Sequence, residues 1–168
     1  MNNLIKKEKF DIDLVKKDLE NLNISQNISE KKRNFYVKMV EDWMNTTHDA
    51  KYLGLAKNEL GDIVAILYKY NTIYLMGEPY RTIMYAPKLL FHYLGENHIH
   101  IDDILVKYNN IGNGSILVNA LKKLAKQNNI YVITGNLSEI DDDHRDRQEH
   151  FYKKLDFKIY DKMIELLL

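Results

Sequence analysis

The chain has 168 residues, a formal net charge of zero and no cysteine. That length suits one domain with a hydrophobic core, and the lack of cysteine excludes disulfides, thiolate zinc sites and a cysteine nucleophile. A neutral surface gives no broad basic field for nucleic acid or an anionic membrane. No signal peptide is evident at the start, and no stretch approaches the ~18 apolar residues that span a bilayer. We therefore expect a single cytoplasmic domain over residues 1–168 that binds neither nucleic acid nor membrane.

The first part of the chain predicts two helices followed by antiparallel strands. Apolar residues recur at helical spacing from Asp11 to Leu22 and again from Glu30 to Met44. Lys51–Lys57 and Ile63–Tyr70 have strand composition, and the loop between them contains a glycine, which is typical of a hairpin. Thr72–Met76 predicts a third strand.

Two prolines interrupt the stretch Gly77–Asn97, which is harder to interpret. Because proline suits the first turn of a helix, Pro87 predicts a short helix that runs to Leu94 and ends at Gly95. The ring side chains of this stretch match no motif. Three roles stay open for them, as the wall of an acceptor pocket, as core packing or as a homodimer contact: Tyr80, Tyr85, Phe91, His92 and Tyr93.

The second half alternates strands and helices. His98–Val106, Ile130–Thr134 and Phe157–Leu168 have strand patterns, whereas Ile116–Lys126 and Asp141–Leu155 have helix patterns. The whole order indicates an α/β (α+β) domain with a mixed, mostly antiparallel sheet that carries helices on both faces.

A glycine-containing loop joins the strand His98–Val106 to the helix that follows it. Gly112 and Gly114 allow a sharp turn that brings several backbone N–H groups together beside the positive end of that helix. Such a loop suits a phosphate group. It lacks the third glycine of a dinucleotide fingerprint and the Gly-Lys-Ser/Thr of a triphosphate loop. On this evidence alone, a plain structural turn is equally open.

A second segment adds to the loop. Phe151-Tyr152-Lys153-Lys154-Leu155-Asp156-Phe157 ends the last helix. Together, the loop 109–114 and this segment resemble the two motifs of the GNAT superfamily of acyl-CoA-dependent N-acyltransferases, Gln/Arg-x-x-Gly-x-Gly/Ala and Phe-Tyr-x-Lys-Leu-Gly-Phe. The sequence departs from the family pattern at Asn109, where Gln or Arg is usual, and at Asp156, where glycine is usual. Aspartate tolerates the positive φ that this glycine position implies.

The resemblance implies an N-acetyltransferase that uses acetyl-CoA and a primary amine of a small molecule or peptide. Tyr152 matches the general acid that protonates the departing thiolate. For the pyrophosphate of the cofactor, the resemblance implies the loop residues Ile111, Gly112, Asn113, Gly114 and Ser115. For the pantetheine arm and the acyl group, it implies the strand residues Ile104, Leu105 and Val106. The alternative is a non-catalytic acyl-CoA-binding or regulatory module with the same fold.

The general base is open. Strand alternation predicts that His98, His100, Asp102, Ile104 and Val106 share one face. GNAT enzymes often take a base from this strand, and His100 or Asp102 fits that position. The same histidines and aspartate could instead suggest a metal site, although the sequence indicates no fourth ligand. The acidic run 141–143 could bind a cation or a polycationic substrate, or could form a solvated helix start.

Overall fold

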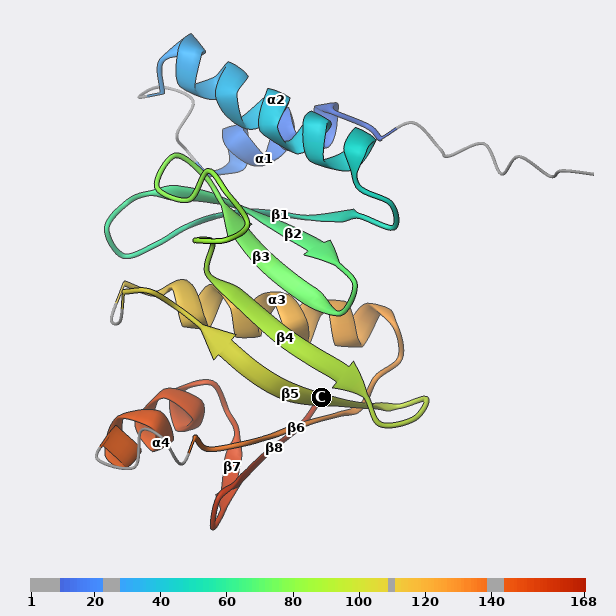
Figure 1. Ribbon diagram of the computed structural model, residues 1–168, viewed down its shortest axis with the longest axis vertical. Helices are drawn as coiled ribbons and strands as arrows, with labels where there is room; N and C mark the ends of the chain where they lie inside the picture. The colour runs from blue at the N-terminus through green and yellow to red at the C-terminus, as the bar shows by residue number, and fades with distance from the viewer. Residues whose placement is uncertain (1–9, 23–27, 109–110, 139–143) are drawn as a thin grey trace, which may run out of the picture.

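The computed structural model describes residues 10–22, 28–108, 111–138 and 144–168, and Figure 1 shows their arrangement. One sheet holds all the strands, and helices pack on it. The elements in chain order are α1 (Asp13–Asn21), α2 (Glu30–Thr46), β1 (Lys51–Lys57), β2 (Ile63–Lys69), β3 (Thr72–Met76), β4 (Lys88–Tyr93), β5 (His98–Leu105), α3 (Asn113–Gln127), β6 (Val132–Asn136), α4 (Arg145–Lys154), β7 (Lys158–Tyr160) and β8 (Met163–Leu167).

The strand order in the sheet is β1-β2-β3-β4-β5-β6-β8-β7. β1 to β5 form an antiparallel meander, β5 and β6 are parallel, and β6, β8 and β7 are again antiparallel. The predicted fold class, a mixed and mostly antiparallel sheet with helices on both faces, is confirmed. Among the described residues, none of the helices combines the length and the hydrophobicity that a membrane crossing requires.

α2 packs through one apolar stripe, as its sequence predicts. Ser29 precedes the helix, and its Oγ accepts the backbone N–H of Lys32 at 3.4 Å, which caps the first turn. Tyr36 is fully buried, and its hydroxyl donates to the carbonyl of Ile63 at 2.6 Å, which fixes the helix against β2. Two turns later Trp43 lies on Tyr74 of β3, with ring centroids 5.6 Å apart.

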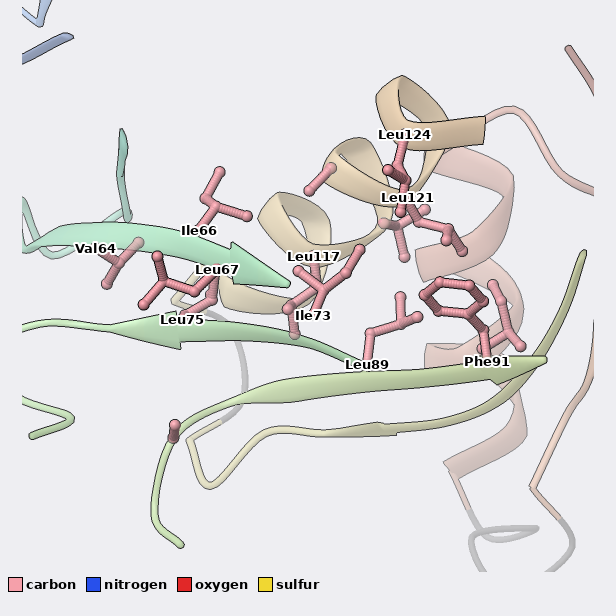
Figure 2. Packing of buried hydrophobic residues seen from close by; sticks show 14 of the residues in the cluster. Val64, Ile66, Leu67, Ile73, Leu75, Leu89, Phe91, Leu117, Leu121 and Leu124 are labelled. Atoms are coloured by element: carbon pink, nitrogen blue, oxygen red, sulfur yellow. The ribbon is translucent and has the colours of Figure 1, made fainter. Parts of the chain in front are cut away.

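α3 covers the opposite face of the sheet and forms the core with it. Leu117, Leu121 and Leu124 recur on one side of the helix and are buried. Figure 2 shows this leucine stripe directed toward Ile73 of β3 and Leu89 of β4. β2 is buried along most of its length because helices cover it on both sides.

The helix predicted from Pro87 to Leu94 is wrong, because this stretch forms β4. Leu89 and Phe91 are buried while the residues between them are more exposed, which is the period of a strand. Pro87 lies where the pairing of β4 with β3 ends: its carbonyl accepts the N–H of Leu75 at 2.9 Å, but it has no N–H to return the bond. Both edges of β4 are paired, with β3 and with β5, so sheet pairing decides its conformation.

The last predicted strand, Phe157–Leu168, is a hairpin instead. β7 and β8 pair antiparallel, and Tyr160 faces Met163 across a two-residue turn. Asp161 begins this turn with φ of +53°, a backbone conformation that aspartate tolerates. The helix predicted over Asp141–Leu155 is α4, and residues 141–143 lie outside the described part of the chain.

Candidate active site

The two parallel strands at the centre of the sheet separate toward their carboxyl ends. β5 pairs with β6 only from His98–Val132 to Ile101–Gly135. Beyond this point β5 continues along β4 to Leu105, while β6 continues along β8, and Figure 1 shows the two strands diverging. We call this gap the β5–β6 opening. Alternate residues of a strand direct their N–H and C=O groups to opposite sides, so some of these groups in β5 face the opening without a strand partner.

A β-bulge lies in β5 at the start of this opening. Phe91 of β4 pairs with Ile101 and Leu90 pairs with Asp103, so Asp102 is an extra residue. The bulge shifts the side-chain alternation by one residue. Ile104 therefore pairs with Leu89 and shares its core face. The prediction that Ile104 and Val106 share a face with His100 and Asp102 is wrong for this reason, and both residues pack against the core.

The loop after β5 has the shape that the sequence predicts for a phosphate site. Gly112 has φ of +82° and is the N-cap residue of α3. An added Cβ would lie 3.1 Å from Cγ of Glu59, and the N–H of Glu59 donates to the carbonyl of Ile111 at 3.0 Å. Among the described residues, no acceptor pairs with the backbone N–H groups of Ile111 to Ser115. These groups and the helix dipole therefore remain available to an anion.

Asn113 faces inward rather than toward a ligand. It is 1% exposed, and its side-chain amide donates to the hydroxyl of Tyr80 at 2.8 Å. Its Oδ1 has no hydrogen-bond partner among the described residues. Only the backbone N–H of Asn113 can thus serve a bound anion, while its side chain connects the loop to the segment between β3 and β4.

A cavity of about 390 Å³ lies beside the first half of α3. Ser115, Asn119 and Lys122 form its wall along one side of the helix. Lys57 from β1 and Lys154 from α4 complete a group of three cations around it. Carboxylates are present as well, from Glu59 and Asp156, and Asp156 lies 3.3 Å from the amine of Lys122. The cavity is continuous with Gly112, so an anion on the loop would extend into basic surroundings.

Tyr152 lies on α4 with its ring in the core. The ring packs edge-to-face on Phe151 and Phe157, at centroid distances of 5.0 and 5.5 Å. Phe151 in turn contacts α3, because a Cβ added at Gly114 would meet its ring at 3.1 Å. Burial, and secondarily the charge of Asp103, raise the pKa of Tyr152 to about 12. The phenol is therefore protonated at neutral pH, and its hydroxyl makes no hydrogen bond to the described residues.

His100 belongs to a polar network on the face of the sheet opposite α3. Its Nδ1 lies 3.0 Å from Oγ1 of Thr134, and the same hydroxyl lies 2.7 Å from Nε2 of His98. The amide nitrogen of Asn136 lies 3.5 Å from Nε2 of His100. In the tautomer that carries the proton on Nδ1, this nitrogen donates to Thr134 and Nε2 is the basic atom facing the amide of Asn136.

The pKa of His100 lies below its ordinary value of 6.5. Burial is the main cause, followed by the neighbouring His92, whose ring centroid is 5.3 Å away; Asp102 acts in the opposite direction. The imidazole is therefore neutral at physiological pH and able to accept a proton.

Asp102 forms a pair with His92 rather than with His100. Its Oδ1 lies 2.7 Å from Nδ1 of His92, and both side chains are almost half exposed. The two groups that the sequence proposes as base are therefore neighbours with different partners. Within the described ranges, no group of histidine, aspartate or glutamate side chains has the geometry of a metal site.

The sequence names His92 and Tyr80 with three roles open, and the structure pairs His92 with His100 across β4 and β5. The sequence gives no site role to Thr134, which it predicts only as the end of a buried strand. Asp156 has φ of +66°, as the glycine position of the motif implies. Asn109, the departure in the loop, lies outside the described residues.

The topology and the loop agree with the resemblance that the two motifs indicate. A meander leads into a parallel pair that separates beside a glycine loop and a helix N-terminus, the arrangement that a resemblance to the GNAT superfamily implies. Solved structures with a similar fold include Ard1 from Thermoplasma volcanium, at 13% identity over 96% of this chain and 95% of that chain, with a TM-score of 0.48. A GNAT family acetyltransferase from Elizabethkingia anophelis, with acetyl-CoA bound, is 14% identical over 64% of this chain and 76% of that chain, with a TM-score of 0.44.

Sequence comparison identifies a relative with much higher identity. The uncharacterized protein YocC of Bacillus subtilis is 34% identical over 127 residues, which are 73% of this chain and 76% of that protein. The chain belongs to the same family as YocC. No model of a protein family matches the sequence.

Proposed function

We propose that this protein transfers an acetyl group from acetyl-CoA to a primary amine. The observation that supports the proposal is that the β5–β6 opening is followed along the chain by the free N–H groups of Ile111 to Ser115, while Asp103 of β5 is near enough to the protonated phenol of Tyr152 to raise its pKa. An acyl-CoA needs each of these parts, namely a slot for its arm, an anion site for its pyrophosphate and an acid for its thiolate.

The residues that would hold the substrate follow from the geometry. The loop N–H groups and the dipole of α3 bind the pyrophosphate, and Lys57, Lys122 and Lys154 attract the remaining phosphate charge. The backbone of Ile104, Leu105 and Val106 lies along the opening and pairs with the amide groups of the pantetheine arm. This set contains main-chain groups for position and side-chain cations for charge.

The reaction requires two proton movements. Attack by the amine forms a C–N bond at the thioester carbon, and a backbone N–H near Leu105 stabilises the oxyanion, which is worth about 3 kcal/mol for one donor. When the C–S bond breaks, Tyr152 donates its proton to the thiolate, and solvent then returns a proton to the phenolate. Nε2 of His100 accepts the proton that the attacking nitrogen loses, directly or through water.

The fold also supports a second candidate, a module that binds acyl-CoA without catalysis. The feature in its favour is the burial of Tyr152, which is 9% exposed and packs its ring on Phe151 and Phe157 as a core residue would. Acetyl-CoA binding by calorimetry, followed by thiol release with a panel of primary amines, separates the two. Amine-dependent thiol release supports the acetyltransferase. Binding of acetyl-CoA without thiol release, whichever amine is added, supports the module.

A further inference from the structure

A second cavity, of about 510 Å³, lies between α2 and the segment that joins β3 to β4. We call it the α2 pocket. Its walls are mainly apolar, and its sheet side is formed by Leu67 of β2 and Met76 of β3. The residues that contribute apolar surface from α2 and the connecting segment are Phe35, Met39, Trp43 and Ile83. A pocket with these walls suits an aromatic or branched aliphatic group.

The charges at the pocket do not cancel. Lys38 and Asp42 pair with each other at 3.3 Å. Arg81 makes no ion pair with the described carboxylates, and its guanidinium lies 5.5 Å above the ring of Phe35. Within the described residues, the side chain makes one hydrogen bond, in which Nε donates to the carbonyl of Glu78 at 3.4 Å. The terminal nitrogens are thus available, and a planar guanidinium favours a carboxylate.

Trp43 adds a second, independent indication of a ligand. The residue is 8% exposed, and its indole N–H has no acceptor among the residues that the structure describes. Buried indole N–H groups normally have a partner, because an unpaired donor is costly. An oxygen of a bound carboxylate or carbonyl that reached the indole would satisfy it.

The α2 pocket lies on the same face of the sheet as His100. Residues paired across strands share a face, and the register leads from Leu67 to Tyr74, then to Lys88 and Leu105. His92 is on that face of β4 too, four residues after Lys88, and it pairs with His100. Because neighbouring strands are about 4.8 Å apart, the β3 side of the pocket lies about 10 Å from β5.

We propose that the α2 pocket binds a carboxylic acid with an aromatic or branched aliphatic group, of the kind that an apolar amino acid presents. The apolar walls hold this group, and Arg81 pairs with the carboxylate. About 10 Å separates the β3 side of the pocket from β5, so a ligand of this size binds apart from the β5–β6 opening, and the proposal does not rest on acetyl transfer.

Trp43 is the single tryptophan of the chain, so its fluorescence reports on this pocket alone. Titrations with L-phenylalanine, 3-phenylpropionate and 2-phenylethylamine separate the roles of the carboxylate and the amine. We expect the first two to change the fluorescence at similar concentrations and the third to bind at least about tenfold more weakly, since it lacks the charged partner of Arg81. The variant R81Q should remove that difference, because glutamine lacks the charge that pairs with the carboxylate, and Arg81 is an exposed residue. R147Q, which alters an exposed arginine on α4, is the matched control and should retain it.

Equal binding of 2-phenylethylamine and 3-phenylpropionate, or no fluorescence response to any of the three compounds, overturns the pocket proposal. Neither result depends on acetyl transfer, so the failure of one proposal leaves the other in place.

Discussion

Replacing Tyr152 by phenylalanine tests the chemistry without disturbing the fold. Phenylalanine retains the edge-to-face contacts with Phe151 and Phe157, and the lost hydroxyl makes no hydrogen bond to the described residues. We therefore expect the free energy of unfolding to change by about 0.5 kcal/mol or less. Removing a general acid, in contrast, should lower turnover by about 10²- to 10⁴-fold, which corresponds to about 3–5 kcal/mol of transition-state stabilisation.

The assay compares kcat, acetyl-CoA affinity and thermal unfolding of Y152F with those of Y160F. Tyr160 is 49% exposed on β7, so its variant controls for the loss of a tyrosine hydroxyl. Affinity for acetyl-CoA should be similar in both variants, because backbone groups and lysines hold the phosphates. Turnover of Y152F equal to that of Y160F would refute the assignment of Tyr152 as the acid.

Three further predictions concern the loop, the base and the segment above the loop. Gly112→Ala should cost about 1–2 kcal/mol of stability, because Gly112 has a positive φ. It should also weaken acetyl-CoA binding in calorimetry, because the added Cβ would lie 3.1 Å from Glu59. Unaltered binding would contradict the assignment of this loop to the phosphate. His100 must be neutral to act as a base and its pKa lies below 6.5, so kcat should fall as the pH decreases through that pKa. His100→Gln should lower kcat and remove this decrease at acidic pH. If the variant retains the decrease, another group causes it. Asn113→Ala leaves the hydroxyl of the buried Tyr80 without its partner and should destabilise the protein by about 1–3 kcal/mol in chemical unfolding. Asn119 is an exposed residue on the same helix, so Asn119→Ala should not show this loss.

Local patterns predict most of the fold. α2 and α3 have apolar stripes at helical spacing, and the hairpin of β1 and β2 has strand composition around a glycine loop, so each is readable from its own residues. β4 is different. Pro87 suggests a helix start, and only the pairing of Lys88–Tyr93 with strands on both sides makes it a strand. A window of sequence contains no information about that pairing.

The candidate site divides in the same way. Gly112 and Tyr152 follow from two motifs, and in the structure Gly112 is the N-cap of α3 and Tyr152 lies on α4. The bulge at Asp102 could not be read from alternation, because one extra residue reverses the faces of Ile104 and Val106. The partners of His100, the proposed base, could not be predicted from the sequence either, because His92 and Thr134 lie on neighbouring strands.

A crystal structure with bound coenzyme A is the most direct test of the proposed cofactor site. We predict that the pyrophosphate accepts hydrogen bonds from the N–H groups of Ile111 to Ser115 and that the pantetheine arm lies along Ile104 to Val106 in the β5–β6 opening. We also predict that the sulfur lies within reach of the Tyr152 hydroxyl. Coenzyme A bound elsewhere on the sheet, or an empty loop at saturating ligand, would contradict the proposed site.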